Sequence, residues 1–103
     1  MSSNSKPDSS PEGQHQAEAH RFVVQTPQGL AVCSYRREHD AQGQDVLVLH
    51  HTEVPAALQG RGIAAALVAA ALAWARSEGL RVRPTCSYVA AYMQRHPETQ
   101  DLL

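Results

Sequence analysis

The sequence predicts a sandwich-like α+β domain with the element order βββαβα and a mixed sheet. Three observations predict this class: three strand-like stretches lie close together before residue 55, an alanine- and leucine-rich segment follows them, and one more strand-like stretch comes after that segment. Strands joined by short turns pair antiparallel, whereas a strand, a helix and a strand in that order form a parallel right-handed crossover. The sheet is therefore expected to be antiparallel at first and parallel at its last pair.

The first three strands are predicted from alternation, apolar runs and turn residues. Residues His20–Thr26 are rich in Phe and Val, and Leu30–Glu38 alternate between two faces. Between them, Pro27–Gly29 has turn composition, because proline presets one dihedral angle and glycine tolerates unusual ones. A second turn, His39–Gly43, leads to the third strand, Val46–Val54, which begins with four successive apolar residues. Such a run indicates burial on both faces at the centre of a sheet.

The second half of the chain is predicted to hold both helices. Residues Gly60–Glu78 are dominated by Ala and Leu, the strongest helix formers, and Gly79 stands where a helix commonly ends. Apolar side chains on two sides of this helix predict contact with the sheet and with a second element. A short strand, Leu80–Pro84, and a second helix, Thr85–Arg95, follow; the residue before Pro97 is pushed out of helical geometry and ends that helix.

Composition limits the size and the surroundings of the protein. A chain of 103 residues with 43% hydrophobic residues suits one small domain. Residues 1–19 contain almost no side chain that could pack, so they are predicted to form a disordered tail in which His15 is solvated, and the domain is predicted to span residues 20–103. The net charge of −1 disfavours a nucleic-acid partner. The absence of a long apolar run and of a secretory signal, with two cysteines only, predicts a cytoplasmic protein without a membrane partner.

A glycine-containing segment at the mouth of the long helix carries the chemistry. The first turn of a helix leaves backbone N–H groups without partners at the positive end of the helix dipole. In Gln59–Ala64 (QGRGIA), two glycines would let an anion approach these groups, and Arg61 adds a positive charge. The segment predicts a phosphate or pyrophosphate site; the alternative is that its glycines only form a tight turn. No lysine of a P-loop follows, and a dinucleotide-binding fold is disfavoured because the next strand, Leu80–Pro84, has no acidic residue.

The same segment resembles the Q/R-x-x-G-x-G/A motif of the GNAT acetyltransferase superfamily. The longer stretch from His51-Thr-Glu-Val-Pro to His96-Pro-Glu, with Cys86-Ser-Tyr-Val inside it, resembles the short single-domain YjdJ-type branch, and the resemblance covers residues 20–103. It implies a minimal GNAT fold and an N-acetyltransferase that uses acetyl-CoA as co-substrate and acts on an unidentified amine. Non-catalytic CoA binding and a protein-interaction module are the alternatives. The implied CoA-binding residues are Val54, Gln59, Gly60, Arg61, Gly62, Ile63, Ala64, Ser87 and Tyr88.

Three residues are candidates for catalysis. Cys86 is predicted at the start of the second helix, where the dipole lowers a thiol pKa, and the resemblance implies a place near the acetyl end of the cofactor. It is interpreted as a nucleophile, as a proton donor to CoA, or as a small buried residue. His51 and Glu53 share one face of their strand, so His51 is a candidate general base and Glu53 acts through water; a structural strand-end histidine is the alternative.

The remaining expectations concern the second cysteine, metals and assembly. Cys33 lies within the second predicted strand and is expected in the core. No metal site is expected, because the chain lacks paired-ligand spacing. A monomer or weak homodimer is expected, with acetyl-CoA and an amine acceptor as partners.

Overall fold

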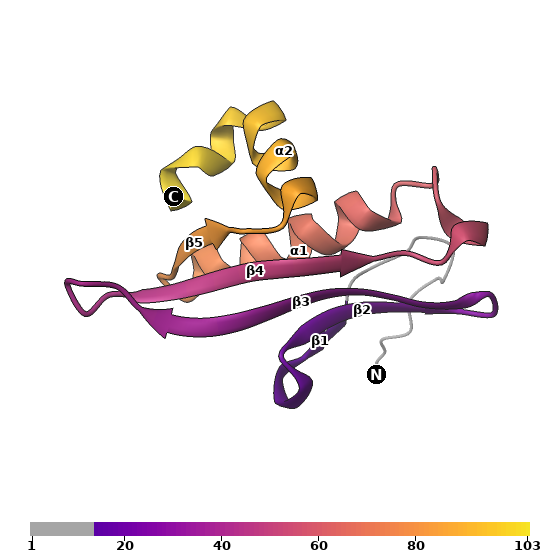
Figure 1. Cartoon of the computed structure of the whole chain (residues 1–103), viewed down its shortest axis with the longest axis horizontal. Helices are drawn as coiled ribbons and strands as arrows, with labels where there is room; N and C mark the ends of the chain where they lie inside the picture. The colour runs from indigo at the N-terminus through magenta and orange to yellow at the C-terminus, as the bar shows by residue number, and fades with distance from the viewer. Residues whose placement is uncertain (1–13) are drawn as a thin grey trace, which may run out of the picture.

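The strands join in chain order into one five-stranded mixed sheet, β1-β2-β3-β4-β5 (Figure 1). A computed structural model of the chain describes residues 14–103. Neighbouring strands are antiparallel from β1 to β4, and β4 and β5 are parallel, as predicted. The strands are β1 (Gln14–Gln16), β2 (Arg21–Thr26), β3 (Gly29–His39), β4 (Asp45–Glu53) and β5 (Arg81–Pro84). The helices are α1 (Ile63–Ser77) and α2 (Ser87–Arg95), with 3-10 turns η1 (Ala17–Ala19), η2 (Ala56–Leu58) and η3 (Pro97–Leu102).

Both α-helices begin later than the sequence predicts. Gly60 and Gly62 have φ angles of +83° and +77°, which is the left-handed region, so α1 starts only at Ile63. Cys86 is the extended residue that precedes α2, with φ −81° and ψ 130°, so this helix starts at Ser87. Residues 60–62 and 85–86, which were predicted to be helical, therefore lead into the two helices instead.

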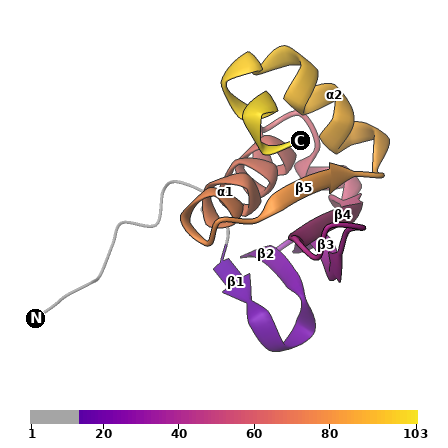
Figure 2. The same ribbon diagram turned by 90° about the vertical axis from the view of Figure 1, so that its left-hand side faces the viewer.

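The core lies between one face of the sheet and the helices. Helix α1 contacts β2, β3, β4 and β5, and α2 packs beside it against β4 and β5 (Figure 2). The fully or almost fully buried side chains of this core come from every layer: Phe22, Cys33, Leu47, Leu49, Leu67, Val68, Leu72, Val82, Val89 and Met93. The predicted contact of α1 with the sheet and with a second element is thus confirmed. No helix in residues 14–103 is long and apolar enough to cross a membrane.

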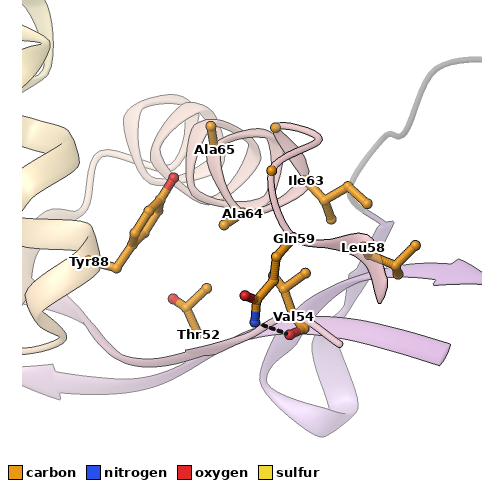
Figure 3. Close-up of a pocket in the computed structure, with 10 residues that line it drawn as sticks. Thr52, Val54, Leu58, Gln59, Ile63, Ala64, Ala65 and Tyr88 are labelled. Carbon is orange, nitrogen blue, oxygen red and sulfur yellow. Dashed lines mark hydrogen bonds between the residues drawn. The ribbon is translucent and has the colours of Figure 1, made fainter. Parts of the chain in front are cut away.

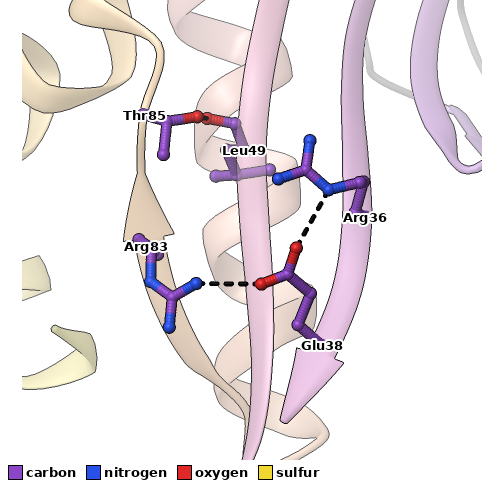
Figure 4. A network of polar contacts seen from close by, with 5 residues as sticks. All are labelled: Arg36, Glu38, Leu49, Arg83 and Thr85. Carbon is purple, nitrogen blue, oxygen red and sulfur yellow. Dashed lines mark hydrogen bonds and ion pairs between the residues drawn. The ribbon is translucent and has the colours of Figure 1, made fainter. Parts of the chain in front are cut away.

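Within residues 14–103, side chains rather than a helix cover the opposite face of the sheet. Val46 and Val48 are 4% and 0% exposed, although they point away from α1. Arg36 on β3 and Arg83 on β5 both donate to the carboxylate of Glu38, at 3.0 and 2.9 Å, and Arg83 reaches this carboxylate across β4 (Figure 4). Val48 pairs with Arg36 and Arg83, and Val46 pairs with Glu38 and Arg81, so these long side chains lie beside the two valines and shield them from water. The predicted burial of β4 on both faces is therefore confirmed.

Part of the segment that was predicted to be a disordered tail is ordered in the structure. Residues 1–13 of that prediction lie outside the described residues, but residues 14–19 form β1 and η1, so for them the prediction of disorder is wrong. Strand β1 pairs antiparallel with β2, with Gln14 opposite Val23 and Gln16 opposite Arg21. The domain therefore begins before residue 20.

One histidine explains why this polar segment is ordered. The His15 ring stacks on Phe22 with centroids 4.2 Å apart and meets the edge of Trp74 at 4.4 Å. Its Nε2 atom lies 2.6 Å from the Tyr35 hydroxyl. His15 thus joins β1 to β2, β3 and α1, and the prediction that it is solvated is wrong. The cause is aromatic contact, which a count of apolar residues does not detect.

Replacing His15 is expected to weaken the fold in a pH-dependent way. His15→Ala removes the aromatic contacts and the hydrogen bond, and should lower the free energy of unfolding by about 1–2 kcal/mol. Burial lowers the pKa of His15 below its ordinary value of 6.5, so the unfolded chain binds this proton more tightly. The stability from neutral His15 is complete above 6.5 and is lost as the pH falls through 6.5 and then through the lowered folded-state pKa.

Denaturant unfolding from about pH 7 to about pH 5 measures this effect. The slope of stability against pH should be smaller in His15→Phe, which keeps the aromatic contacts but does not titrate. His50→Gln, which replaces an exposed histidine of β4, is the control. It should keep the part of the slope of stability against pH that His15 contributes in the wild type. Equal slopes in the wild type and His15→Phe would contradict the assignment.

Candidate functional site

A pocket of about 450 Å³ opens where the start of α1, the end of β4 and the start of α2 meet (Figure 3). Its polar side chains are those of Thr52 from β4, Gln59 from the loop and Tyr88 from α2. The full lining is Thr52, Val54, Leu58, Gln59, Gly60, Gly62, Ile63, Ala64, Ala65 and Tyr88.

The pocket exists because β4 and β5 separate. Their parallel pairing ends where Leu49 faces Pro84. The N–H groups of Thr85 and Cys86 then both donate to the Leu49 carbonyl, at 3.2 and 3.1 Å, which turns the chain into α2. Strand β4 continues to Glu53 and, in the part of the chain that the structure describes, pairs there with β3 alone. The space between the two diverging chains is the pocket.

The glycine loop forms the opposite wall. A Cβ atom at Gly60 or Gly62 would meet no atom within 4 Å, so open space surrounds both glycines. Gly62 precedes the helix without a side-chain cap, which leaves the first-turn N–H groups of α1 without a side-chain partner. The Gln59 side-chain amide donates to the Val54 carbonyl at 3.1 Å and ties the loop to the end of β4 (Figure 3). Geometry and dipole both suit an anion at this helix end.

Cys86 reaches the pocket through Thr52. The Cys86 thiol donates to Thr52 Oγ1 at 3.7 Å, although Cys86 itself does not line the pocket. Burial opposes ionisation of this thiol, but the hydrogen bonds that the backbone N–H groups of Val89 and Tyr88 donate to the sulfur, together with its hydrogen bond with Thr52, outweigh burial, so the pKa of Cys86 is lowered. A lowered pKa favours the thiolate, which is the reactive form.

Cys33 differs from Cys86 in every one of these respects. Its side chain is fully buried in the core, which confirms the prediction for this residue. Burial raises the pKa of Cys33 to about 11, against a smaller lowering by the hydrogen bond that Thr52 donates to its sulfur at 3.8 Å. Cys33 is therefore a protonated core residue and a natural control for Cys86.

His51 and Glu53 lie on the other side of β4. They share a face, as predicted, and His51 Nε2 is 3.3 Å from Glu53 Oε1. Both are exposed, and neither lines the pocket, because side chains alternate along a strand and the pocket face is taken by Thr52 and Val54. The structure does not bring the predicted base and its carboxylate to the predicted cofactor residues.

A bulge causes this difference. Tyr35 pairs with Leu49 but Ser34 pairs with His51, so His50 is an extra residue in β4. If β4 had no bulge, regular alternation from Leu49 would place the His51 side chain on the core face. With it, Thr52 lies opposite Cys33 and takes that face.

Most of the predicted CoA-binding residues meet at the pocket. Seven of them line it: Val54, Gln59, Gly60, Gly62, Ile63, Ala64 and Tyr88. Arg61 and Ser87 are exposed and lie outside the lining. The sequence analysis missed Thr52, Leu58 and Ala65; Ala65 had a detectable signal, since it belongs to the first turn of α1. Within residues 14–103, no three His, Cys, Asp or Glu side chains are grouped to hold a metal ion.

Fold and site together define an α+β domain with an anion-compatible helix end at the point where its parallel strands separate. The profile of the GCN5-related N-acetyl-transferase family matches residues 21–102, and the chain belongs to this family.

Several vertebrate proteins are similar to part of the chain. Protein NATD1 of Homo sapiens is 43% identical over 60 residues, which cover 58% of this chain and 53% of that protein. Protein NATD1 of Mus musculus is 43% identical and that of Danio rerio 38% identical over 60 residues, and each match covers 58% of this chain and 54% of the relative. The match spans about half the length of these relatives.

The two thiols are expected to differ in reactivity. Iodoacetamide should modify Cys86 in the folded protein and leave Cys33 protected, because Cys86 is partly exposed with a lowered pKa and Cys33 is buried. Peptide mass spectrometry over time measures both. The Cys33 peptide should become reactive only in denaturant. Equal rates for the two thiols in the folded protein would contradict the assigned environments.

Proposed function

We propose that the chain binds acetyl-CoA in this pocket and transfers the acetyl group to an amine. The observation that carries the proposal is the uncapped start of α1 behind Gly60 and Gly62, at one wall of the pocket between the diverging strands. Membership of the GCN5-related N-acetyl-transferase family supports it.

The residues present fit the parts of such a ligand. The diphosphate suits the N–H groups at the start of α1, where open space surrounds both glycines and Arg61 adds positive charge nearby. The pantetheine arm carries amides, and among the described strands none pairs with the second edge of β4 beyond Leu49. This edge leads to Thr52, and hence the acetyl end is proposed to lie near Cys86.

Acetyl transfer through Cys86 accounts for its position and its lowered pKa. The Cys86 thiolate attacks the thioester carbonyl, the bond from carbon to the CoA sulfur breaks, and CoA leaves as a thiolate that takes up a proton. The amine then attacks acetyl-Cys86, forms an amide and loses a proton, and the thiolate is regenerated. In the alternative role, Cys86 donates its proton to CoA after direct attack by the amine.

A second candidate function is CoA binding without turnover. One observation favours it: among the described residues, those that line the pocket include no carboxylate and no imidazole, since His51 and Glu53 face away. An amine acceptor would then lack a base at the site unless it arrives deprotonated.

Both cysteines are free thiols, in keeping with the proposed location in the reducing cytoplasm.

Acetyl-CoA should stabilise the protein, and a charge at Gly62 should abolish this effect. At ten times the dissociation constant, binding adds about 1.4 kcal/mol, or roughly 6–10 °C in melting temperature. Gly62→Glu places a carboxylate where the diphosphate is proposed to lie and should remove the shift. Gly79→Glu is the matched control, since Gly79 also has a left-handed φ, +70°, and open space but lies at the other end of α1.

Calorimetry of the wild type with acetyl-CoA completes this test. A melting shift and measurable heat in the wild type and in Gly79→Glu, but not in Gly62→Glu, support the proposed pocket. No heat and no shift in the wild type would exclude both acetyl-CoA functions.

Turnover should depend on Cys86 and not on Cys33. With acetyl-CoA and a panel of primary amines, Cys86→Ala should release free CoA about a hundredfold more slowly, whereas Cys33→Ala should keep most of the rate. Intact mass without an amine distinguishes the two roles of Cys86: a gain of one acetyl group on the Cys86 peptide marks the nucleophile. Release of CoA at the wild-type rate by Cys86→Ala would overturn both roles, and no release with any amine would favour the binding module.

A further inference from the structure

We propose that Thr52 is a positioning residue, which holds the Cys86 sulfur at the edge of the pocket and stabilises its thiolate. This inference rests on the proposed function of the pocket for its role in acetyl transfer. It concerns a residue that no pattern in the sequence singled out.

The place of Thr52 in the fold makes it the link between pocket and thiol. It follows the bulge in β4, so its side chain points to the core face, opposite Cys33 on β3. It also lines the pocket, where Gln59 is already engaged with the Val54 carbonyl and Tyr88 comes from α2. Thr52 is thus the β4 side chain that touches both the pocket and Cys86.

The hydroxyl of Thr52 serves both sulfurs at once. A hydroxyl has one hydrogen to donate and two lone pairs to accept with. Here Oγ1 accepts from the Cys86 thiol at 3.7 Å and donates to Cys33 Sγ at 3.8 Å. The bond to Cys33 is weak, because a neutral thiol sulfur is a poor acceptor.

Loss of the Cys86 proton reverses this arrangement. The Thr52 O–H can rotate from Cys33 toward the Cys86 thiolate, and a hydrogen bond to a charged acceptor is roughly twice as strong as a neutral one. The Cys33 S–H can then donate to the vacated lone pair of Thr52. Apart from the proton that Cys86 loses, the side chains of Thr52, Cys33 and Cys86 keep all their protons in this step.

The surroundings add little charge that could replace this hydroxyl. Among residues 14–103, no charged side chain contributes to the lowered pKa of Cys86, and Cys33 on β3, a titratable neighbour, is buried and protonated. Helix α1 presents apolar side chains to the pocket, and His51 and Glu53 of β4 face the other way. The hydroxyl and the N–H groups at the start of α2 are therefore the groups that favour the thiolate.

Paired variants separate the hydroxyl from the shape of the side chain. Thr52→Val keeps the branched shape and the strand preference but removes the hydroxyl, whereas Thr52→Ser keeps the hydroxyl and removes a methyl group. The rate of Cys86 alkylation by iodoacetamide, without acetyl-CoA, is measured by peptide mass spectrometry across pH. This profile reports the ionisation of Cys86, which a purely structural role of Thr52 would not move.

Thr52→Val should move the alkylation profile to higher pH and slow the reaction at neutral pH by about tenfold, and Thr52→Ser should stay within about twofold of the wild type. Thr52→Ala provides a second variant without the hydroxyl and should move the profile in the same direction. A wild-type profile in Thr52→Val, or an equal shift in Thr52→Ser, would overturn the proposal. Since the assay contains no acetyl-CoA, its outcome is independent of the melting shift that tests the proposed function.

Discussion

The extra residue in β4 is the constraint on which the site depends. Because His50 has no partner on β3, the strand changes the face that it presents to the core between Leu49 and Thr52. Two side chains of very different chemistry exchange places as a result. A hydroxyl joins the two thiols inside the domain, and an imidazole goes to the water side. This single irregularity decides that Thr52, and not His51, is the side chain of β4 that lines the pocket.

The carbonyl of Leu49 gives the pocket its second boundary. It accepts two consecutive N–H groups, and this double acceptance ends the parallel pairing and starts α2. The same turn leaves Cys86 extended, with its sulfur directed to Thr52. Strand separation, helix start and thiol position therefore have one common cause. The glycine loop closes the space from the other side, held to the end of β4 by Gln59.

The sequence predicted those parts of the structure that local physics determines. Alternation, apolar runs and glycine positions revealed β2, β3, β4 and α1, as well as the loop that lines the pocket. The bulge left no such trace, since His50 and His51 are both polar and either fits the water side. The sequence also gave no local sign that residues 14–16 form a strand, because β1 depends on the contact of His15 with aromatic rings from distant segments. Local patterns do not report contacts of that kind.

The arginine pair over β4 has a consequence for the behaviour of the molecule in solution. Among the described residues, Val46 and Val48 are kept from water by side chains of the neighbouring strands, including Arg36, Glu38 and Arg83, and not by a second layer of backbone. Truncating Arg36 or Arg83 would expose Val48 on the surface of the sheet, and exposed apolar surface favours self-association. The ion-paired arginines thus cover apolar surface of β4 as well as carrying charge.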